Sequence, residues 1–287
     1  MVRRILLTVS LAAFCSCNVL DLKGLVMPTG EGVEKRFEQS REMNADLKHG
    51  VVETEEAYTF YVATDPHINE THRNLSMFND AFRNDASAPF GVILGDCIDV
   101  RDNLPAYLSA LAYNPEIHQY NSAVFHVLGN HDIFFNGWVD FKDMVGPSSY
   151  WFEVVFEGGK DLFITLDTAT GTLGRKQIEW FKSFLSDERT DYRHCVILTH
   201  TNFFYTDNSQ ATSGNMPFEE SMALLDFLGR QDVTLVLQGH DHYREDLEYD
   251  GTRYVVVGAI HDETEHPEYL KVNVASEGIS LEFNTLR

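Results

Sequence analysis

Basic residues are scarce in this 287-residue sequence. Lys and Arg together number 22 against 44 Asp and Glu, which gives a formal net charge of −22. Because the overall field of such a protein repels a nucleic-acid backbone, and no local Lys/Arg cluster offsets it, we expect no nucleic-acid partner. The acidity is typical of a well-solvated surface.

Cysteine is also rare, with four residues, and long apolar runs are lacking except near the amino terminus. There Arg3 and Arg4 precede an apolar run over residues 5–14, which at about ten residues is half the length of a membrane-spanning helix. We expect residues 1–16 to be a cleaved secretion signal. The segment resembles a bacterial lipoprotein signal with Cys17 as the lipidated residue, although ordinary cleavage near residues 11–13 is an alternative. The protein is therefore expected to be exported and lipid-anchored in the bacterial cell envelope, in the periplasm or at the cell surface.

The rest of the chain divides into two parts. Residues 17–56 carry many charges and no strong strand pattern, so we expect a tether followed by one charged helix. Residues 57–287 are expected to form one domain, without repeats or low-complexity tracts. Within it, Cys97 and Cys195 each adjoin a strand-like apolar run, which favours buried free thiols over a disulfide.

Strand-like and helix-like patterns alternate within this domain. Short, β-branched apolar runs occupy residues 57–64, 89–95, 122–129, 193–200, 233–239 and 253–259. Because these runs are mostly continuous rather than alternating, they predict strands buried on both faces. Residues 173–188 have helical periodicity, whereas residues 149–167 and 269–286 are typical of strand pairs. The pattern predicts an α/β domain whose sheets are covered by helices and edged by antiparallel strands.

Polar residues follow five of these strands at the point where each strand ends. They are Asp65, His67, Asp96, Asn130, His131, His200, His240 and His242. Ligands bind outside the carboxyl ends of strands in open α/β sheets, so we expect these side chains to meet in one crevice. The other histidines show no such placement and are expected on the surface or in the core: His49, His72, His118, His126, His194, His261 and His266.

The composition of this set indicates metal binding. Imidazole, carboxylate and amide groups together suit Zn²⁺, Mn²⁺ or Fe²⁺, whereas an all-oxygen set would indicate Ca²⁺ or Mg²⁺. The candidate ligands outnumber the needs of one ion, and one aspartate bridging two ions would accommodate them. We therefore expect two divalent metal ions, Mn, Fe or Zn, although either short histidine motif alone would more often be a turn.

The ordered motifs D-x-H, G-D, G-N-H-D, H and G-H-x-H, spread over residues 57–260, resemble the calcineurin-like metallophosphoesterase superfamily. The resemblance implies an α/β (α+β) four-layer fold of two packed mixed β-sheets flanked by helices. It also implies that Asp65, His67 and His242 bind one ion. A second ion would be bound by Asn130, His200 and His240, with Asp96 bridging the two. In that family His131 is catalytic, next to the leaving group, and Asp132 is the expected partner that orients it.

One position departs from the purple acid phosphatases within that superfamily. Those enzymes carry a tyrosine three residues after the bridging aspartate, where it binds ferric iron, and this sequence has Asp99 there. A tyrosinate-bound Fe³⁺ is therefore not expected, and the closer resemblance is to the cyclic-nucleotide phosphodiesterase-like branch. We favour Asp99 as a carboxylate that supports a metal ligand over the alternative of a helix-starting residue.

These features predict a phosphoesterase that hydrolyses small phosphomonoesters or phosphodiesters. A phosphate ester repels hydroxide, so hydrolysis needs its oxygens neutralised and a water deprotonated, and attack by a metal-bound hydroxide meets both needs. His131 would assist the leaving group. A nuclease of the same superfamily is disfavoured by the acidic charge, and a non-catalytic scaffold by the intact ligand set.

Overall fold

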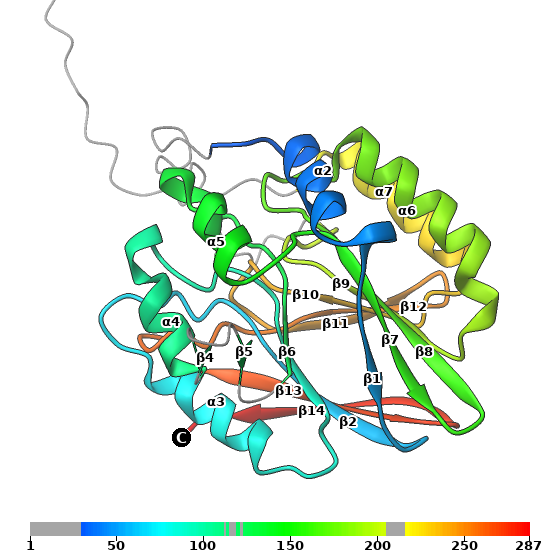
Figure 1. The fold of residues 1–287 in the computed structure, drawn as a ribbon. Helices are drawn as coiled ribbons and strands as arrows, with labels where there is room; N and C mark the ends of the chain where they lie inside the picture. The colour runs from blue at the N-terminus through cyan, green and yellow to red at the C-terminus, as the bar shows by residue number, and fades with distance from the viewer. Residues whose placement is uncertain (1–29, 112, 115–118, 121–122, 205–215) are drawn as a thin grey trace, which may run out of the picture.

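Two mixed β-sheets pack face to face and helices cover both outer faces, giving four layers (Figure 1). The computed structural model describes residues 30–111, 113–114, 119–120, 123–204 and 216–287. The expected fold class is confirmed. The signal segment and Cys17 lie outside the described residues, and none of the described helices is long and apolar enough to cross a membrane. Cys97 and Cys195 are buried free thiols, as predicted.

The larger sheet has seven strands and the smaller has five. In spatial order the larger sheet contains β1 (Lys48–Glu53), β7 (Tyr150–Phe156), β8 (Gly159–Thr165), β9 (Cys195–Leu198), β10 (Leu235–Gln238), β12 (Thr252–Val256) and β11 (Glu245–Tyr249). The smaller contains β14 (Gly278–Thr285), β13 (Glu268–Ala275), β2 (Tyr58–Ala63), β3 (Phe90–Ile93) and β6 (Val124–His126). A separate pair joins β4 (Tyr113–Asn114) to β5 (Gln119–Tyr120). The predicted strand pairs are the hairpins β7–β8 and β13–β14.

Helices divide between the two outer faces. The core cluster over the seven-stranded sheet includes residues of α2, α6 and α7, and the cluster over the five-stranded sheet includes residues of α3, α4 and α5. The α-helices are α2 (Val33–Met43), α3 (Arg73–Arg83), α4 (Leu104–Ala110), α5 (Trp138–Met144), α6 (Gly174–Glu188) and α7 (Phe218–Arg230). Short 3-10 turns are η1 (Ala45–Leu47), η2 (Arg101–Asn103), η3 (His131–Asn136) and η4 (Arg189–Asp191).

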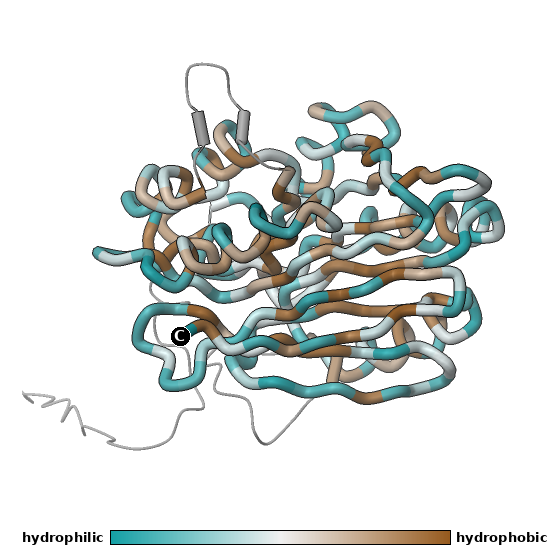
Figure 2. Tube along the Cα trace, turned by 90° about the horizontal axis from the view of Figure 1, so that it is seen from below, coloured by the Kyte–Doolittle hydropathy of each residue, from teal (hydrophilic) through white to brown (hydrophobic). Residues whose placement is uncertain are grey.

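Aromatic side chains fill the space between the sheets. Phe60 and Phe90 of the smaller sheet pack against Phe152 and Phe163 of the larger one, with ring centroids between 5.3 and 5.6 Å apart. Strands β2, β3, β9 and β10 are buried along their full length, which explains their continuous apolar sequences. Figure 2 shows the hydrophobic colour running along the strands and the hydrophilic colour gathering in connecting loops.

The structure corrects the expectation that residues 17–56 form only a tether and one helix. Beyond the expected charged helix, α2, it contains the strand β1, which pairs in parallel with β7 at the edge of the larger sheet. Phe37 of α2 is buried in the core over that sheet. The strand was missed because its side chains are mostly exposed or half-buried, so it lacks a continuous apolar run. Residues 33–53 are therefore part of the domain rather than a tether.

An ion pair without solvent contact fixes α2 to the larger sheet. The Arg36 guanidinium donates from Nε and Nη2 to the two carboxylate oxygens of Asp167, at 2.8 and 2.9 Å, and both side chains are fully buried. Asp167 lies just past β8, and its backbone carbonyl accepts a bond from Gln177 of α6. One pair thus joins helix and sheet.

Replacing Arg36 with alanine should lower the free energy of unfolding by about 3–5 kcal/mol, because it strands the buried Asp167 charge. Chemical denaturation of the full chain measures this. Arg175→Ala is the matched control, because Arg175 pairs with Glu179 on the exposed face of α6, and there we expect a loss of at most about 0.5 kcal/mol. Equal losses in the two variants would contradict the structural role of α2.

Parallel pairing brings the carboxyl ends of the central strands to one edge of the molecule. In the smaller sheet β2, β3 and β6 run parallel, and in the larger sheet β8, β9, β10 and β12 do. The two edges meet directly, because the Ile260 amide after β12 donates to the Thr64 carbonyl after β2, at 3.1 Å. The loops that follow these strands therefore share one site.

Candidate metal centre

The loops approach one another so closely that two glycines have no room for a side chain. A Cβ on Gly129 would lie 2.1 Å from the Asp96 amide nitrogen, and one on Gly239 would lie 2.0 Å from Thr64 Oγ1. Non-bonded atoms do not approach this closely, so any larger residue would push the loops apart. The glycines that precede Asn130 and His240 in the sequence motifs are therefore explained by contact between loops.

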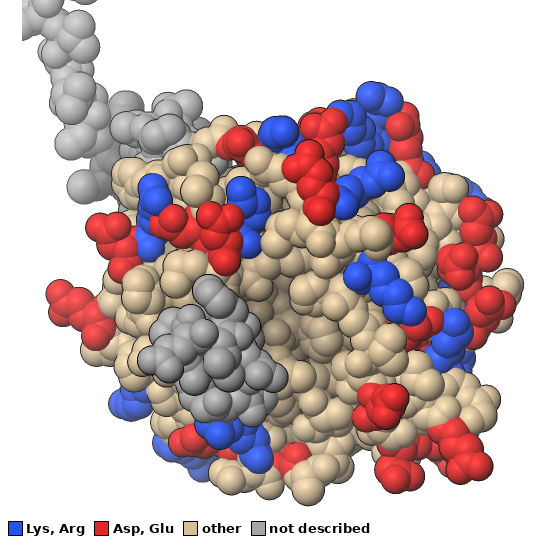
Figure 3. All heavy atoms as spheres, in the orientation of Figure 1, with Lys and Arg blue, Asp and Glu red and all other residues tan. Residues whose placement is uncertain are grey.

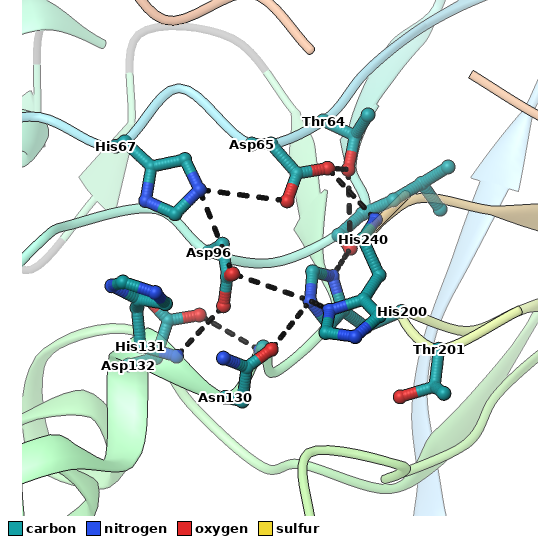
Figure 4. A network of polar contacts seen from close by, with 12 residues as sticks. Thr64, Asp65, His67, Asp96, Asn130, His131, Asp132, His200, Thr201 and His240 are labelled. Atoms are coloured by element: carbon teal, nitrogen blue, oxygen red, sulfur yellow. Dashed lines mark hydrogen bonds and ion pairs between the residues drawn. The ribbon is translucent and has the colours of Figure 1, made fainter. Parts of the chain in front are cut away.

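An unusual backbone conformation aims several of the side chains. Five of the predicted site residues have positive φ values between 43° and 71°, which is uncommon for any residue other than glycine. They are Asp65, His67, Asp96, His240 and His242. Such conformations cost of order 1–3 kcal/mol each and concentrate at functional sites. The fold thus holds these loops in strained turns that direct the side chains into one space (Figure 4).

One group of side chains lies at the ends of β2 and β10. The ligand atoms of Asp65, His67 and His242 all lie within 4.8 Å of one another. Asp65 Oδ2 accepts bonds from Thr64 Oγ1 at 2.6 Å and from the His240 amide at 2.9 Å. Its other oxygen, Oδ1, is buried without a hydrogen bond from any described residue and faces the Nε2 atoms of His242 and His67, at 3.3 and 3.7 Å.

A second, more deeply buried group lies at the ends of β3, β6, β9 and β10. His200 Nδ1 donates to the Leu94 carbonyl at 2.7 Å, which leaves Nε2 to face the site. This Nε2 lies 3.1 Å from Asn130 Oδ1, 3.1 Å from His240 Nδ1 and 3.4 Å from Asp96 Oδ2. Electron pairs that face one another repel unless a proton or a cation lies between them.

Asp96 connects the two groups. Its Oδ2 lies 3.6 Å from His67 Nε2 and 3.4 Å from His200 Nε2, while its Oδ1 accepts the His131 amide at 2.8 Å. Burial disfavours charge on both histidines, yet the carboxylates around them raise the pKa of His67 to about 10 and that of His200 to about 9. The site therefore attracts positive charge strongly. Its donor set, with an orphaned carboxylate oxygen, fits a divalent cation at each group.

Asp99 takes the supporting place that the sequence favours for it. Its Oδ1 accepts from His67 Nδ1 at 3.1 Å, so that the proton of the His67 ring lies on Nδ1 and Nε2 points into the site. Carboxylates in this position orient a histidine ligand and make it more basic. Asp99 and His131 also form a candidate ligand group with His67, but this group uses the His67 nitrogen that faces away from Asp96.

The role expected for Asp132 was wrong, because its side chain does not orient His131. Its carboxylate is fully buried and accepts backbone N–H bonds from Gly129, Cys97 and Ile98, at 2.8 to 3.3 Å. It thereby ties the loop after β3 to the loop after β6. Successive residues in the η3 turn point in different directions, so adjacency in sequence does not bring these two side chains together. Among the described carboxylates, Asp99 is the one that forms an ion pair with the His131 ring, with Oδ1 at 3.8 Å from Nδ1.

The sequence analysis missed one histidine at this site. The ring centroid of His261 lies 6.0 Å from that of His67 and 5.7 Å from that of His242. A signal was available, since His261 closely follows the strand run 253–259 and so obeys the same rule that identified the other residues.

Comparison with protein families gives one match. Residues 58–244 match the model of the calcineurin-like phosphoesterases, a span that contains all seven predicted ligands. No curated protein matches the chain in sequence.

Several solved structures share the fold. Purple acid phosphatase PPD1 from yellow lupin (Lupinus luteus) superposes with a TM-score of 0.59 at 14% identity, covering 81% of this chain and 52% of that one. A dimetal phosphatase from Danio rerio gives 0.56 at 14% identity, covering 79% and 98% of the two chains. GAP50, the anchor in the inner membrane complex of Plasmodium, gives 0.58 at 15% identity, covering 80% and 84%. At these identities the likeness establishes the fold alone.

Proposed function

Because this chain belongs to the calcineurin-like phosphoesterase family and is thus a hydrolase of phosphoester bonds, we propose that it cleaves small phosphomonoesters or phosphodiesters at a pair of divalent metal ions. The observation that carries the proposal is the position of Asp96 Oδ2 between two histidine groups, 3.6 Å from His67 Nε2 and 3.4 Å from His200 Nε2. A single carboxylate oxygen placed in this way suits the bridge of a two-metal site.

Each group has a distinct part in the proposal. Asp65, His67 and His242 would hold one ion, Asn130, His200 and His240 the other, and Asp96 both. When bound, the two ions neutralise phosphoryl oxygens and lower the pKa of a water from about 15.7 toward about 7. The protein keeps the two histidine Nε2 atoms aimed inward through the bonds that Asp99 and the Leu94 carbonyl accept.

His131 would act on the leaving group. Its ring lies beside that of His67, with centroids 4.5 Å apart, and rests on Phe134 with centroids 4.8 Å apart. It is 17% exposed, whereas Asp65 and His200 are fully buried, so it lies on the open side of the centre. A donor there can protonate or hydrogen-bond the departing oxygen.

The charge distribution favours small substrates over nucleic acid. On the face drawn in Figure 3, described Lys and Arg residues are interspersed with Asp and Glu around a hollow, instead of forming a continuous basic track. Phosphate contacts from such a track supply most of the affinity of proteins for nucleic-acid backbones. A small ester does not need them.

A substrate panel tests the proposal. The full chain, loaded in turn with Mn²⁺, Zn²⁺ or Fe²⁺, is assayed on p-nitrophenyl phosphate, bis-p-nitrophenyl phosphate, cyclic nucleotides and single-stranded DNA, with metal content measured by mass spectrometry. We expect two ions per chain, and chelator-sensitive hydrolysis of at least one small ester. Rapid digestion of the DNA alone would favour the nuclease alternative, and no hydrolysis of any substrate by the metal-loaded chain would favour a scaffold.

Metal affinity should increase with pH. His67 and His200 have pKa values near 10 and 9, so at neutral pH in the metal-free protein both ring nitrogens of each are protonated. A metal ion can bind only after one of these protons leaves and frees a lone pair. Each displaced proton makes the apparent affinity rise about tenfold per pH unit, until the pH passes the corresponding pKa. Calorimetric titration with Mn²⁺ at pH 6.5, 7.5 and 8.5, in buffers of different ionisation enthalpy, measures the affinity and the proton release. An affinity that is flat over this range would contradict the electrostatics described above.

A further inference from the structure

Among the predicted ligands and the described histidines beside them, histidines are the side chains that reach the surface, and they mark the opening of the centre. Asp65, Asp96, His200 and His240 are at most 3% exposed. His67, His131 and His242 are 10%, 17% and 24% exposed at the side chain, and His261 is half-buried beside them. A substrate therefore has to enter past these four imidazoles. His131 lies on one side of the opening, against His67, and His261 lies against both His67 and His242.

The backbone on either side of His261 is firmly held. The Ile260 amide donates to Thr64, next to the ligand Asp65. On the other side, the Asp262 carboxylate accepts the Arg73 and Asn74 amides at the start of α3, at 2.9 and 2.8 Å. Asn74 Nδ2 also donates to the His261 carbonyl at 3.2 Å. The backbone that carries the ring is thus fixed from two elements, the strand edge and α3.

The nitrogens of the His261 ring are free to bind a ligand. Among the described residues, neither of its nitrogens has a hydrogen-bond partner, and it is absent from every group whose ligand atoms lie within 4.8 Å of one another. It is therefore set back from the predicted ligands. A ring that lies against two predicted ligands and has no hydrogen bond to a described residue is suited to contact a bound molecule.

The chemistry of a phosphoester supplies that partner. A phosphomonoester has three non-bridging oxygens, one more than two ions would contact if each bound one, and the leaving-group donor contacts the ester oxygen instead. The carboxylates of the centre, Asp65, Asp96 and Asp99, form ion pairs only with histidines among the described residues, so none of them has a Lys or Arg paired with it. An imidazole N–H is the available donor.

We propose that His261 is a substrate-binding residue that donates a hydrogen bond to a non-bridging phosphoryl oxygen, on the side of the centre opposite the leaving group. This inference rests on the proposed phosphoesterase function and adds to it a phosphate contact supplied by the loop after β12. It assigns binding of the phosphoryl group to His261 and departure of the alcohol to His131.

Orthophosphate is the probe that separates binding from turnover. Its dissociation constant is measured by calorimetry on the Mn²⁺-loaded full chain, for the native sequence, His261→Ala, His261→Gln and His266→Ala. His266 lies in the same loop with a side chain 79% exposed, which makes it the matched control. Loss of a hydrogen bond to a charged group should weaken orthophosphate binding about 10–100-fold in His261→Ala. His261→Gln, which keeps an N–H donor, should recover part of the affinity, and His266→Ala should match the native protein.

Kinetics on p-nitrophenyl phosphate adds a second measurement. We expect His261→Ala to raise KM by a similar factor, to leave kcat within about threefold, and to keep the native metal content and melting temperature. Unchanged orthophosphate affinity would overturn the assignment, and so would loss of a metal ion in His261→Ala, which would make the residue a ligand. If the native chain binds orthophosphate but hydrolyses no ester, the phosphoesterase proposal fails while the contact with His261 is still measured by the calorimetry.

Discussion

Asp96→Asn should remove metal from both halves of the centre and with it nearly all turnover. One oxygen of Asp96 faces His67 and His200, so the substitution takes a full negative charge from both proposed ions at once. Residues that only support a metal ligand cost about 10–100-fold in affinity when replaced, so loss of this shared ligand should cost more than about 100-fold at each site. Equilibrium dialysis followed by mass spectrometry of the metals measures the loss. Asparagine is the sharp choice, because its amide oxygen can still accept the His131 N–H that Asp96 Oδ1 accepts.

Asp99→Asn is the graded control for that experiment. Asp99 touches His67 alone among the ligands, through the nitrogen that faces away from the centre. Its loss should therefore weaken one ion about 10–100-fold and spare the other. If Asp96→Asn kept one ion at full affinity, Asp96 would not be shared. A melting temperature measured without metal would show whether either variant is simply unfolded.

His131→Ala should keep its metals and lose turnover by roughly 10²–10⁴-fold, the usual contribution of a general acid. The effect depends on the substrate, because an alkyl alcohol leaves only with a proton donor whereas p-nitrophenolate leaves readily without one. We therefore expect the largest loss on alkyl phosphates and a much smaller one on p-nitrophenyl esters. The ratio of kcat/KM for the two substrates, native over variant, is the measurement.

Two results would count against this assignment of His131. A loss of bound metal in His131→Ala would mean that the residue is a ligand. An equal loss of turnover on alkyl and p-nitrophenyl esters would mean that the residue acts before departure of the alcohol. Because the comparison is made within one variant, a partly folded preparation lowers both rates and leaves the ratio unchanged.

The sequence predicted the central strands, and the grouping of the candidate ligands at their ends, for one physical reason. A strand buried on both faces must be apolar throughout, and the polar residue that ends it is then conspicuous. Asp65 after β2, Asp96 after β3 and His200 after β9 all stand out in this way, and the structure brings all three into one space.

Two other features could not be read from local pattern. Strand β1 is stabilised by pairing with β7 at a sheet edge, so its own sequence shows mixed polarity. The bonds from the Cys97 and Ile98 amides to Asp132 join loops more than 30 residues apart, and nothing in the short motif G-N-H-D predicts them. His261 was within reach of the strand-end rule and was overlooked.

The left-handed turns at Asp65, His67, Asp96, His240 and His242 also limit how the centre can change during evolution. Aspartate, asparagine and histidine enter that backbone region several times more readily than other residues that carry a side chain, whereas valine or isoleucine would be severely strained there. Most mutations at these positions therefore destabilise the fold through backbone strain, in addition to any effect on metal binding. The residues that are tolerated there, aspartate, asparagine and histidine, each bring an oxygen or nitrogen donor. Substitutions that accumulate at these five positions are therefore biased toward a change of metal preference rather than toward loss of the metal site.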